Sequence, residues 1–452
     1  PVLIHLPQEI NNLENINVKG VFIGFINNFV SKAVFTTNLG LLKTDITLKK
    51  LDNKKEKFLY YGDLQANNFN IGNIIGSNSK LGSISCKLNI SGIGINIDNI
   101  KANISGIVDS LYFMDYCYKN IDIKGDFMEK KFKGNLLIYD PYIKLNFSGL
   151  IDFSDIDTLP LFDFKAKLQN VYLSKLNLFK RDSMPILSAN MVMKFKGNNI
   201  DNIFGNILVD SLYYSEGKKK YFINKINLLV DNDDKNNKKL ELNSDFVYAS
   251  VCGSFKFSYL PASLDNFLDD YLPSFVLYKK SYSDVNLPEE NFVYEINLKE
   301  INPLFELFFP KLKILSNALF KGNYSSINNF FEINGVLPQL EYIDYIFKNI
   351  NFNVKTENHI INTNINCSKL YVNKNIIFEN ADVKSDIKND SILFTIGWDN
   401  LKDSAKNSGQ LVGYMFFKTK SMLELSLAPS FFVINDSIWN VNEKNEIFID
   451  TN

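Results

Sequence analysis

The feature that most constrains this chain is a period of two in its apolar residues. Between Tyr142 and Phe153, for example, Ile143, Leu145 and Phe147 alternate with polar residues. Such alternation is typical of a β-strand with one buried and one solvated face, and it recurs along the whole sequence. Parallel sheets covered by helices on both faces show continuous apolar runs instead. The alternation therefore predicts an all-β protein built from antiparallel strands.

A second regularity is a repeated triplet of an apolar residue, a polar residue and glycine, as in Ile104-Ser105-Gly106 and Phe147-Ser148-Gly149. Between Gly92 and Gly149 the glycines recur at about the pitch of one strand plus its turn. Two interpretations remain open at this point. The glycines could form hairpin turns, or they could form bends and bulges inside strands, where glycine lets a long sheet coil.

The length of the chain has unusual consequences for a sheet. A chain of 452 residues would ordinarily contain about three domains, but one strand and turn per 10 to 13 residues gives about 35 strands. Open sheets rarely exceed about ten strands without curling or splitting. We therefore expect a long, curled, mainly antiparallel β-sheet that forms an open groove, with a few short inserted helices. Alternation alone does not separate this groove from an ordinary sandwich of two sheets.

Two helices are predicted inside this β protein. The first runs from Leu264 to Leu272, after Pro261-Ala262-Ser263, with Ser263 as its capping residue and Pro273 as its stop. The second begins at Asn302 and ends before Pro310. The residues between the helices change in character. We expect a β-groove segment over 1–273, a connector over 274–291 and a second segment over 292–452, continuous with the first.

Composition argues against several classes of function. The net charge is −1, from 49 basic and 50 acidic residues, whereas nucleic-acid binding requires a basic surface. Two histidines and four widely spaced cysteines predict isolated buried thiols and neither a metal site nor a cofactor. Among the aspartates, Asp140-Pro141 is a turn dipeptide. We expect a protein that is not an enzyme, with a carbohydrate-active β-solenoid enzyme as an alternative that needs clustered carboxylates.

If the sheet only half closes, its apolar side forms a trough suited to lipid acyl chains. The residues expected to line this trough share the apolar side of predicted strands. They are Ile84, Leu88, Ile90, Ile143, Leu145, Phe147, Met193, Phe195, Val247, Val251, Phe255 and Phe257. No apolar run reaches the roughly 18 residues of a membrane-spanning helix.

Several short motifs together resemble one family. They are Val18-Lys19-Gly20-Val21-Phe22-Ile23-Gly24, Tyr61-Gly62-Asp63-Leu64, Asn68-Phe69-Asn70-Ile71-Gly72, Ser110-Leu111-Tyr112-Phe113, Ser244-Asp245-Phe246-Val247 and Ile396-Gly397-Trp398-Asp399-Asn400. In combination, and over nearly the whole chain, they are similar to translocation and assembly module proteins of the TamB family from Bacteroidetes-type bacteria, within the AsmA-like group of bridge-like lipid transfer proteins. The heavy use of Asn, Ile and Lys departs from commoner members.

The resemblance implies a protein anchored in the inner membrane whose body crosses the periplasm as a β-groove. Its implied partners are phospholipids, the inner membrane through an N-terminal anchor, and an outer-membrane barrel protein of the TamA/BamA type through a C-terminal domain. Neither the anchor nor that domain is recognisable in this sequence, which predicts an interior fragment. The implied function is phospholipid transport between the two membranes. The alternative is a scaffold that assists outer-membrane protein insertion by strand pairing.

Overall fold

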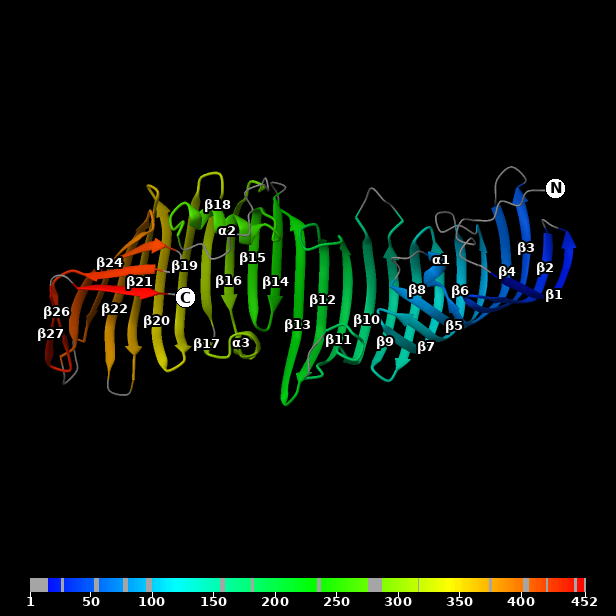
Figure 1. The fold of residues 1–452 in the computed structure, drawn as a ribbon, viewed down its shortest axis with the longest axis horizontal. Helices are drawn as coiled ribbons and strands as arrows, with labels where there is room; N and C mark the ends of the chain where they lie inside the picture. Colours follow the sequence, from blue (N-terminus) through cyan, green and yellow to red (C-terminus); the bar gives the residue numbers. More distant parts are fainter. Residues whose placement is uncertain are drawn as a thin grey trace. The chain divides into compact units, whose positions relative to one another are not determined.

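The fold is all-β, as the alternation predicted. The computed structural model describes residues 15–450 except 26–27, 53–56, 76–79, 95–99, 155–158, 180–182, 234–236, 275–286, 316, 374–375, 401–405, 420–421 and 443–444. These residues form 28 strands and three short helices (Figure 1). The expected count of about 35 strands was too high, because many strands run for 13 or 14 residues. The chain divides into two compact units, Pro1–Ile226 and Asn227–Asn452.

Unit 1 is an antiparallel meander, in which each strand pairs with the next one along the chain. Its strands are β1 (Ile16–Phe25), β2 (Asn28–Thr37), β3 (Gly40–Asp52), β4 (Lys57–Asn70), β5 (Leu81–Ile93), β6 (Lys101–Phe113), β7 (Tyr116–Met128), β8 (Lys131–Asp140), β9 (Ile143–Asp152), β10 (Leu161–Tyr172), β11 (Ile186–Lys196) and β12 (Phe204–Glu216). The pairing runs without interruption from β1 to β12. A short helix, α1 (Gly72–Ile75), lies between β4 and β5, and β13 (Lys219–Asn232) contains the unit boundary.

Unit 2 follows the same plan with a more complex end. Its strands are β14 (Lys238–Ser244), β15 (Val247–Ser254), β16 (Asn291–Leu298), β17 (Leu312–Ile314), β18 (Ala318–Ser325), β19 (Phe330–Tyr342), β20 (Tyr345–Glu357), β21 (Ile360–Tyr371), β22 (Ile377–Lys388), β23 (Ser391–Asp399), β24 (Ser408–Thr419), β25 (Met422–Leu427), β26 (Ser430–Ile434), β27 (Ser437–Val441) and β28 (Glu446–Asp450). Antiparallel pairing continues from β14 to β24. There β24 pairs with both β25 and β26, and the sheet branches.

The strands bend where an asparagine adopts a left-handed conformation within a strand. In unit 1 these residues include Asn68 (φ 45°) and Asn170 (φ 50°), both at places where the strand register shifts. Each donates its backbone N–H to a serine hydroxyl of the next strand, over 2.9 Å to Ser85 and to Ser188 respectively. An extra residue in one strand bends it and increases its twist.

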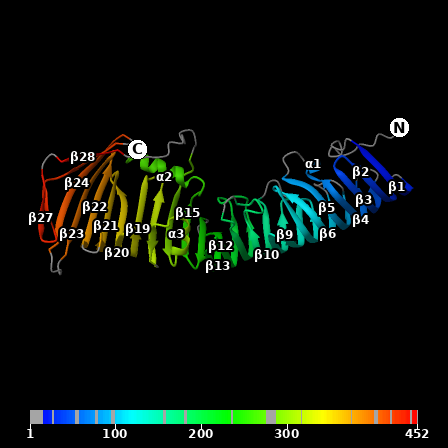
Figure 2. The same ribbon diagram turned by 60° about the horizontal axis from the view of Figure 1, so that its bottom comes forward.

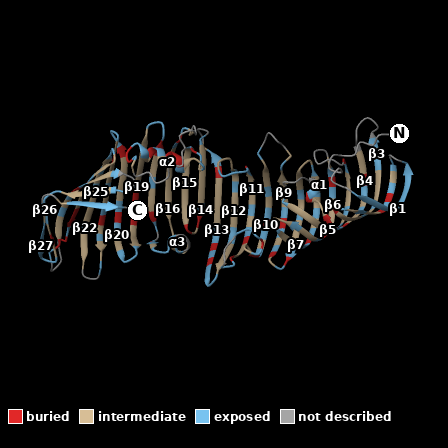
Figure 3. Cartoon of the chain, in the orientation of Figure 1, coloured by how far each residue is buried: buried red, intermediate tan, exposed pale blue. Residues whose placement is uncertain are grey.

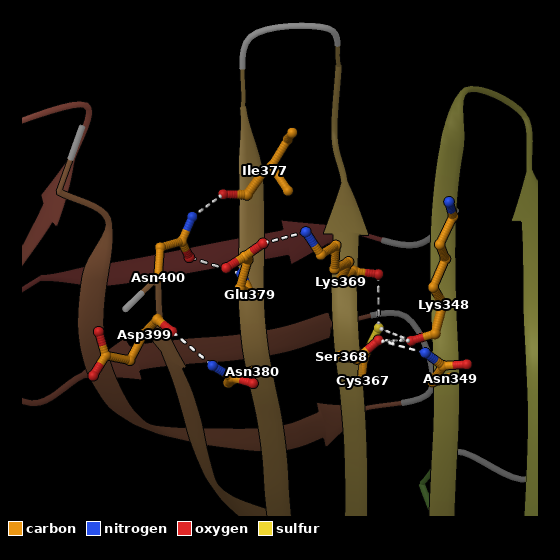
Figure 4. Close-up of polar contacts among 10 residues, drawn as sticks. All are labelled: Lys348, Asn349, Cys367, Ser368, Lys369, Ile377, Glu379, Asn380, Asp399 and Asn400. Carbon is orange, nitrogen blue, oxygen red and sulfur yellow. Dashed lines mark hydrogen bonds and ion pairs between the residues drawn. The ribbon is translucent and has the colours of Figure 1, made fainter. Parts of the chain in front are cut away.

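The same device recurs in unit 2, where Figure 4 shows two of its asparagines. Asn349 (φ 49°) donates a side-chain hydrogen bond to the Ser368 hydroxyl over 3.0 Å. Asn380 (φ 47°) donates one to the carbonyl of Asp399 over 3.0 Å. Both units are therefore curved by the same local feature of the chain.

The repeated glycines lie inside strands, except Gly197 directly after β11, so the interpretation as hairpin turns was wrong and the interpretation as positions within strands holds. Gly149, within β9, has φ of 152°, and a Cβ atom there would lie 2.4 Å from Cα of Phe164 in β10. The hairpin turns are instead made by other residue pairs with positive φ, such as Asn358 and His359. Positive φ at both central residues is the signature of a type I′ turn.

A row of buried residues crosses several strands of each unit, beside the asparagine bends. These buried rows consist of residues that face each other on adjacent strands: Ala66, Cys86, Val108, Ile121 and Ile138 in unit 1, and Leu337, Ile350 and Cys367 in unit 2. All are less than 9% exposed. Each sheet curves at the bends, so that its own side chains surround this buried row. The row therefore forms a core without a second layer.

The helices lie close to where they were predicted, but one capping assignment was wrong. Helix α2 (Leu260–Asp269) begins before Pro261, with Tyr259 at its N-cap. Ser263 therefore lies inside the first turn, and its hydroxyl caps nothing. Helix α3 (Asn302–Phe308) begins at the predicted residue. Most of the expected connector, residues 275–286, lies outside the described residues.

Candidate functional site: the uncovered apolar face

The candidate site is the apolar face of the sheet in each unit. Directly opposite residues on antiparallel strands point to the same face, so the strand register defines continuous rows of side chains. In unit 1 the open row is Ile46, Ile90, Ile104, Phe164, Met193 and Ile207, with Gly62, Gly125, Gly134 and Gly149 between them. This row crosses the strands from β3 to β12 without a charged residue.

Unit 2 has a corresponding open row from β16 to β24. It consists of Ile296, Phe320, Phe352, Ile365, Val383, Ile396 and Leu411, with Gly335 between the two phenylalanines. The rings of Phe320 and Phe352 lie 5.9 Å apart, and the Phe352 ring lies over Gly335. An aromatic ring that covers a glycine in this way protects the backbone where a sheet is strongly curved.

The two open rows differ from the buried rows in their exposure. Every apolar side chain of the open rows is half-buried, whereas the buried rows are closed to solvent (Figure 3). The ribbon of unit 1 shows a single layer of strands (Figure 2), whereas in unit 2 the sheet branches at β24 and its last strands run across the direction of β20 to β22 (Figure 1). The chain exposes 27991 Å² in all, against about 17,000 Å² for a compact protein of this length. Many large apolar side chains are exposed, among them Ile107, Phe222 and Val293.

Helix α2 covers one part of the apolar face in unit 2. Phe267, Tyr271 and Leu272 pack against Tyr324 and Ile361 of the sheet. In unit 1 the ends of the strands curl around a larger cluster that includes Val171 and the fully buried Leu176. These contacts close the face near the strand ends and leave the open rows uncovered.

Ten of the twelve residues predicted to line the trough lie in strands, on the same side as the open rows, and their role as a lipid lining stays a prediction. Ile84, Leu88 and Ile90 are in β5, Ile143, Leu145 and Phe147 in β9, Met193 and Phe195 in β11, and Val247 and Val251 in β15, while Phe255 and Phe257 follow β15 directly. Ile143, Phe147 and Phe255 are buried by their neighbours, and the other nine are half-buried. Phe147, for instance, packs its ring 5.0 Å from that of Phe164.

The open row of unit 2 contains residues that the prediction missed. Four of them are half-buried, like most of the predicted residues, and lie on the same face as Val251: Phe320, Phe352, Ile365 and Val383. Their signal was present in the sequence, because Ile361, Thr363 and Ile365 alternate as clearly as the strands of unit 1.

The opposite face is polar and carries charges of both signs. Lys32 and Asp45 form an ion pair of 3.0 Å across β2 and β3, and Lys321 pairs with Glu295 at 3.2 Å across β18 and β16. Exposed pairs of this kind contribute little to stability. Their mixture means that the polar face has no single-sign field to attract a charged ligand.

The cysteines and aspartates singled out in the sequence have structural roles. All four cysteines are free thiols, and burial raises the pKa of Cys86 and of Cys367, which makes these thiols unreactive. The carboxylate of Asp140 accepts hydrogen bonds from Tyr116 Oη (2.6 Å) and from two backbone N–H groups, those of Tyr142 and Lys119. It holds the turn that the Asp140-Pro141 dipeptide predicted.

Among the described residues, no group of three His, Cys, Asp or Glu side chains is placed to hold a metal ion. No helix in this part of the chain is long and apolar enough to cross a membrane. The chain matches no protein-family model, no curated protein and no solved structure.

Proposed function

We propose that this chain is a lipid carrier that shields acyl chains on the apolar face of its sheet. The observation that carries the proposal is the half-buried state of the apolar side chains in the open rows, which extend over many adjacent strands. Removing apolar surface from water is favourable by about 25 cal/mol per Å². An acyl chain lying along an open row would gain this free energy without any catalytic group.

The resemblance to the TamB family supports a specific version of this proposal. In that version the chain is part of a periplasmic, inner-membrane-anchored protein that carries phospholipid between the inner and outer membranes. Its partners would be phospholipids, the inner membrane and an outer-membrane barrel protein of the TamA/BamA type.

Photo-crosslinking tests the proposal directly, because neighbouring residues of one strand point to opposite faces. A crosslinking amino acid at Phe352 or Ile365 would lie on the apolar face, and the matched controls at Asn353 and Asn364 on the polar face. With the chain expressed in bacterial cells, we expect phospholipid adducts from the first pair only, together with phospholipid in native mass spectra. Equal labelling of both faces, or lipid-free protein throughout, would contradict acyl-chain shielding.

A second candidate function is a scaffold that pairs with strands of client proteins, and strand β1 favours it. All ten residues of β1 are exposed, with Ile23 at 67% and Phe25 at 83%. The edge of β1 away from β2 has no pairing strand among the described residues, and exposed apolar edges are templates for strand addition. A crosslinker at Val21 should then capture unfolded outer-membrane proteins, while one at Phe352 should not. Capture of lipid alone would reject this candidate.

A further inference from the structure

A cleft in unit 2 lies beside helix α2, at the edge of the apolar face. Its volume is about 660 Å³, and its walls come from α2, the residues before β16 and the turn between β18 and β19. The same helix packs Phe267 and Tyr271 onto the apolar face. A molecule in the cleft would therefore sit next to any acyl chain held on that face.

The described residues that line the cleft include acidic and aromatic side chains and no basic one. Asp269, Asp270 and Glu289 supply carboxylates, and Phe267 and Tyr324 supply rings. None of the three carboxylates takes part in an ion pair within the described part of the chain. Asp270 accepts one hydrogen bond, from Asn329 Nδ2 at 2.8 Å.

The position of two of these carboxylates is unfavourable for the helix itself. Asp269 is the last residue of α2 and Asp270 is its C-cap, and the last turn contains no basic residue. The C-terminus of a helix carries a partial negative charge, so anionic side chains there destabilise it. Local rules are broken in this way mainly at functional sites, and a bound cation would offset the repulsion.

Two buried polar atoms without partners lie in the same region. Among the described residues, the hydroxyl of Ser263, a residue only 3% exposed that lines the cleft, makes no hydrogen bond. Glu290 is completely buried; its Oε1 accepts a hydrogen bond from the backbone N–H of Lys256 over 3.2 Å, and its Oε2 has no partner in the described part of the chain. Burial, and then the charge of Glu290, raise the pKa of Tyr324 to about 12, so that this phenol stays neutral. The cleft therefore lies beside a buried hydroxyl without a partner among the described residues, in acidic surroundings.

The arrangement of carboxylates and aromatic rings in the cleft indicates which class of ligand it would bind. Among the described residues no three acidic groups converge on a metal site, whereas carboxylates dispersed around aromatic rings are the usual surroundings of organic ammonium groups. We infer that the cleft binds the ammonium group of an aminophospholipid head group. This inference rests on the proposed lipid-carrying function, because the acyl chains of the same molecule would lie on the adjacent apolar face.

Two sets of probes test the inference with the whole chain. The first is a titration with glycerophosphoethanolamine and with glycerophosphoglycerol, which carry head groups without acyl chains. The second is native mass spectrometry after incubation with vesicles of equal phosphatidylethanolamine and phosphatidylglycerol. We expect roughly tenfold preference for the ethanolamine compound in both, weakened by added salt.

Glu289→Gln, an exposed change outside the helix, should reduce the preference, and Asp269→Asn with Asp270→Asn should abolish it. The control Asp265→Asn, on α2 but outside the cleft lining, should not change it.

The outcomes separate this inference from the proposed function. Equal binding of both phospholipids would overturn the ammonium site and leave acyl-chain shielding intact. Binding of glycerophosphoethanolamine without any phospholipid would support the ammonium site and reject the lipid carrier, which would make a soluble amine the ligand. Binding of neither class would overturn both. A preference that survives all three carboxylate changes would also overturn the ammonium site, provided that circular dichroism shows the variants to be folded.

Discussion

At the scale of single residues, the curvature of each sheet depends on asparagines that no sequence pattern identified. Asn120 (φ 52°) and Asn380 (φ 47°) occupy equivalent bends in the two units, and each donates its side-chain amide to a carbonyl of the following strand. Asparagine also fills the extended positions of the polar face, as Asn146 does. The residue type alone therefore could not distinguish a bend from a solvated position, because the difference lies in the register of the neighbouring strand.

Substitutions at Asn120 test this role. Asn120→Gly should cost little, because glycine adopts positive φ without strain. Asn120→Val should destabilise unit 1 by about 1–3 kcal/mol, because a β-branched residue is strained in that conformation. Urea denaturation followed by circular dichroism measures the difference. Asn146→Val, in an extended position, serves as the control, and similar losses at Asn120 for glycine and valine would refute the argument.

Asp140 provides a second test at this scale. Because all three of its partners are donors, Asp140→Asn would turn an amide N–H toward a donor and leave a buried group unpaired. We expect a loss of about 1.5–3 kcal/mol in the free energy of unfolding. The exposed Asp122→Asn in β7 should change stability by less than about 0.5 kcal/mol. If the two variants unfold at the same urea concentration, the Asp140 network has no structural role.

At the scale of strands and helices, the sequence was most informative where the period was regular. The alternation in β5, β9, β11 and β15 placed ten of the twelve predicted lining residues on the apolar side of their strands. The start of α2 was misjudged by one turn because Ser263 resembles a cap, yet tertiary packing of Phe267 on the sheet fixes the helix earlier. Packing partners distant in sequence are not visible in a local motif.

The apolar face contains both packed and open positions, and two carboxylate substitutions distinguish them. Phe147 is 7% exposed and lies between Phe132 and Phe164, so Phe147→Asp should cost about 3–5 kcal/mol. Val251 is half-buried, and Val251→Asp should cost about 1–2 kcal/mol, because water reaches the carboxylate. The variant Val251→Asp should stay folded and lose bound phospholipid. Retention of phospholipid in a folded Val251→Asp protein would argue against this face as the carrier surface.

At the scale of the whole molecule, length and composition alone suggested an ordinary globular protein, and only the arrangement of the strands changed that interpretation. The 46% of hydrophobic residues is ordinary for a globular protein, but here much of it lies on uncovered sheet faces. Period-two alternation could not establish this, because a sandwich shows the same pattern with its apolar face covered by a second sheet. Whether a face is covered depends on contacts between distant segments.

An uncovered face has a calorimetric signature. Unfolding of an ordinary 452-residue protein raises the heat capacity by about 5–7 kcal/mol/K, mainly through newly exposed apolar surface. This chain should show a smaller increase when free of lipid, because the open rows already contact water. Adding phospholipid should raise the value. Scanning calorimetry of delipidated and lipid-loaded protein measures both, and an ordinary value for the delipidated chain would mean that the open rows are covered.

The strand order of unit 1 also determines how such a protein can change during evolution. Each strand from β2 to β11 bonds only to the strands before and after it in the chain, so its energetics are those of a one-dimensional array with nearest-neighbour coupling. Duplication or loss of one hairpin would change the span of the array by about 10 Å and leave every other pairing in place. Length is then a quantity that selection can adjust in small steps, and under the proposed function it would be matched to the distance that the carrier has to bridge.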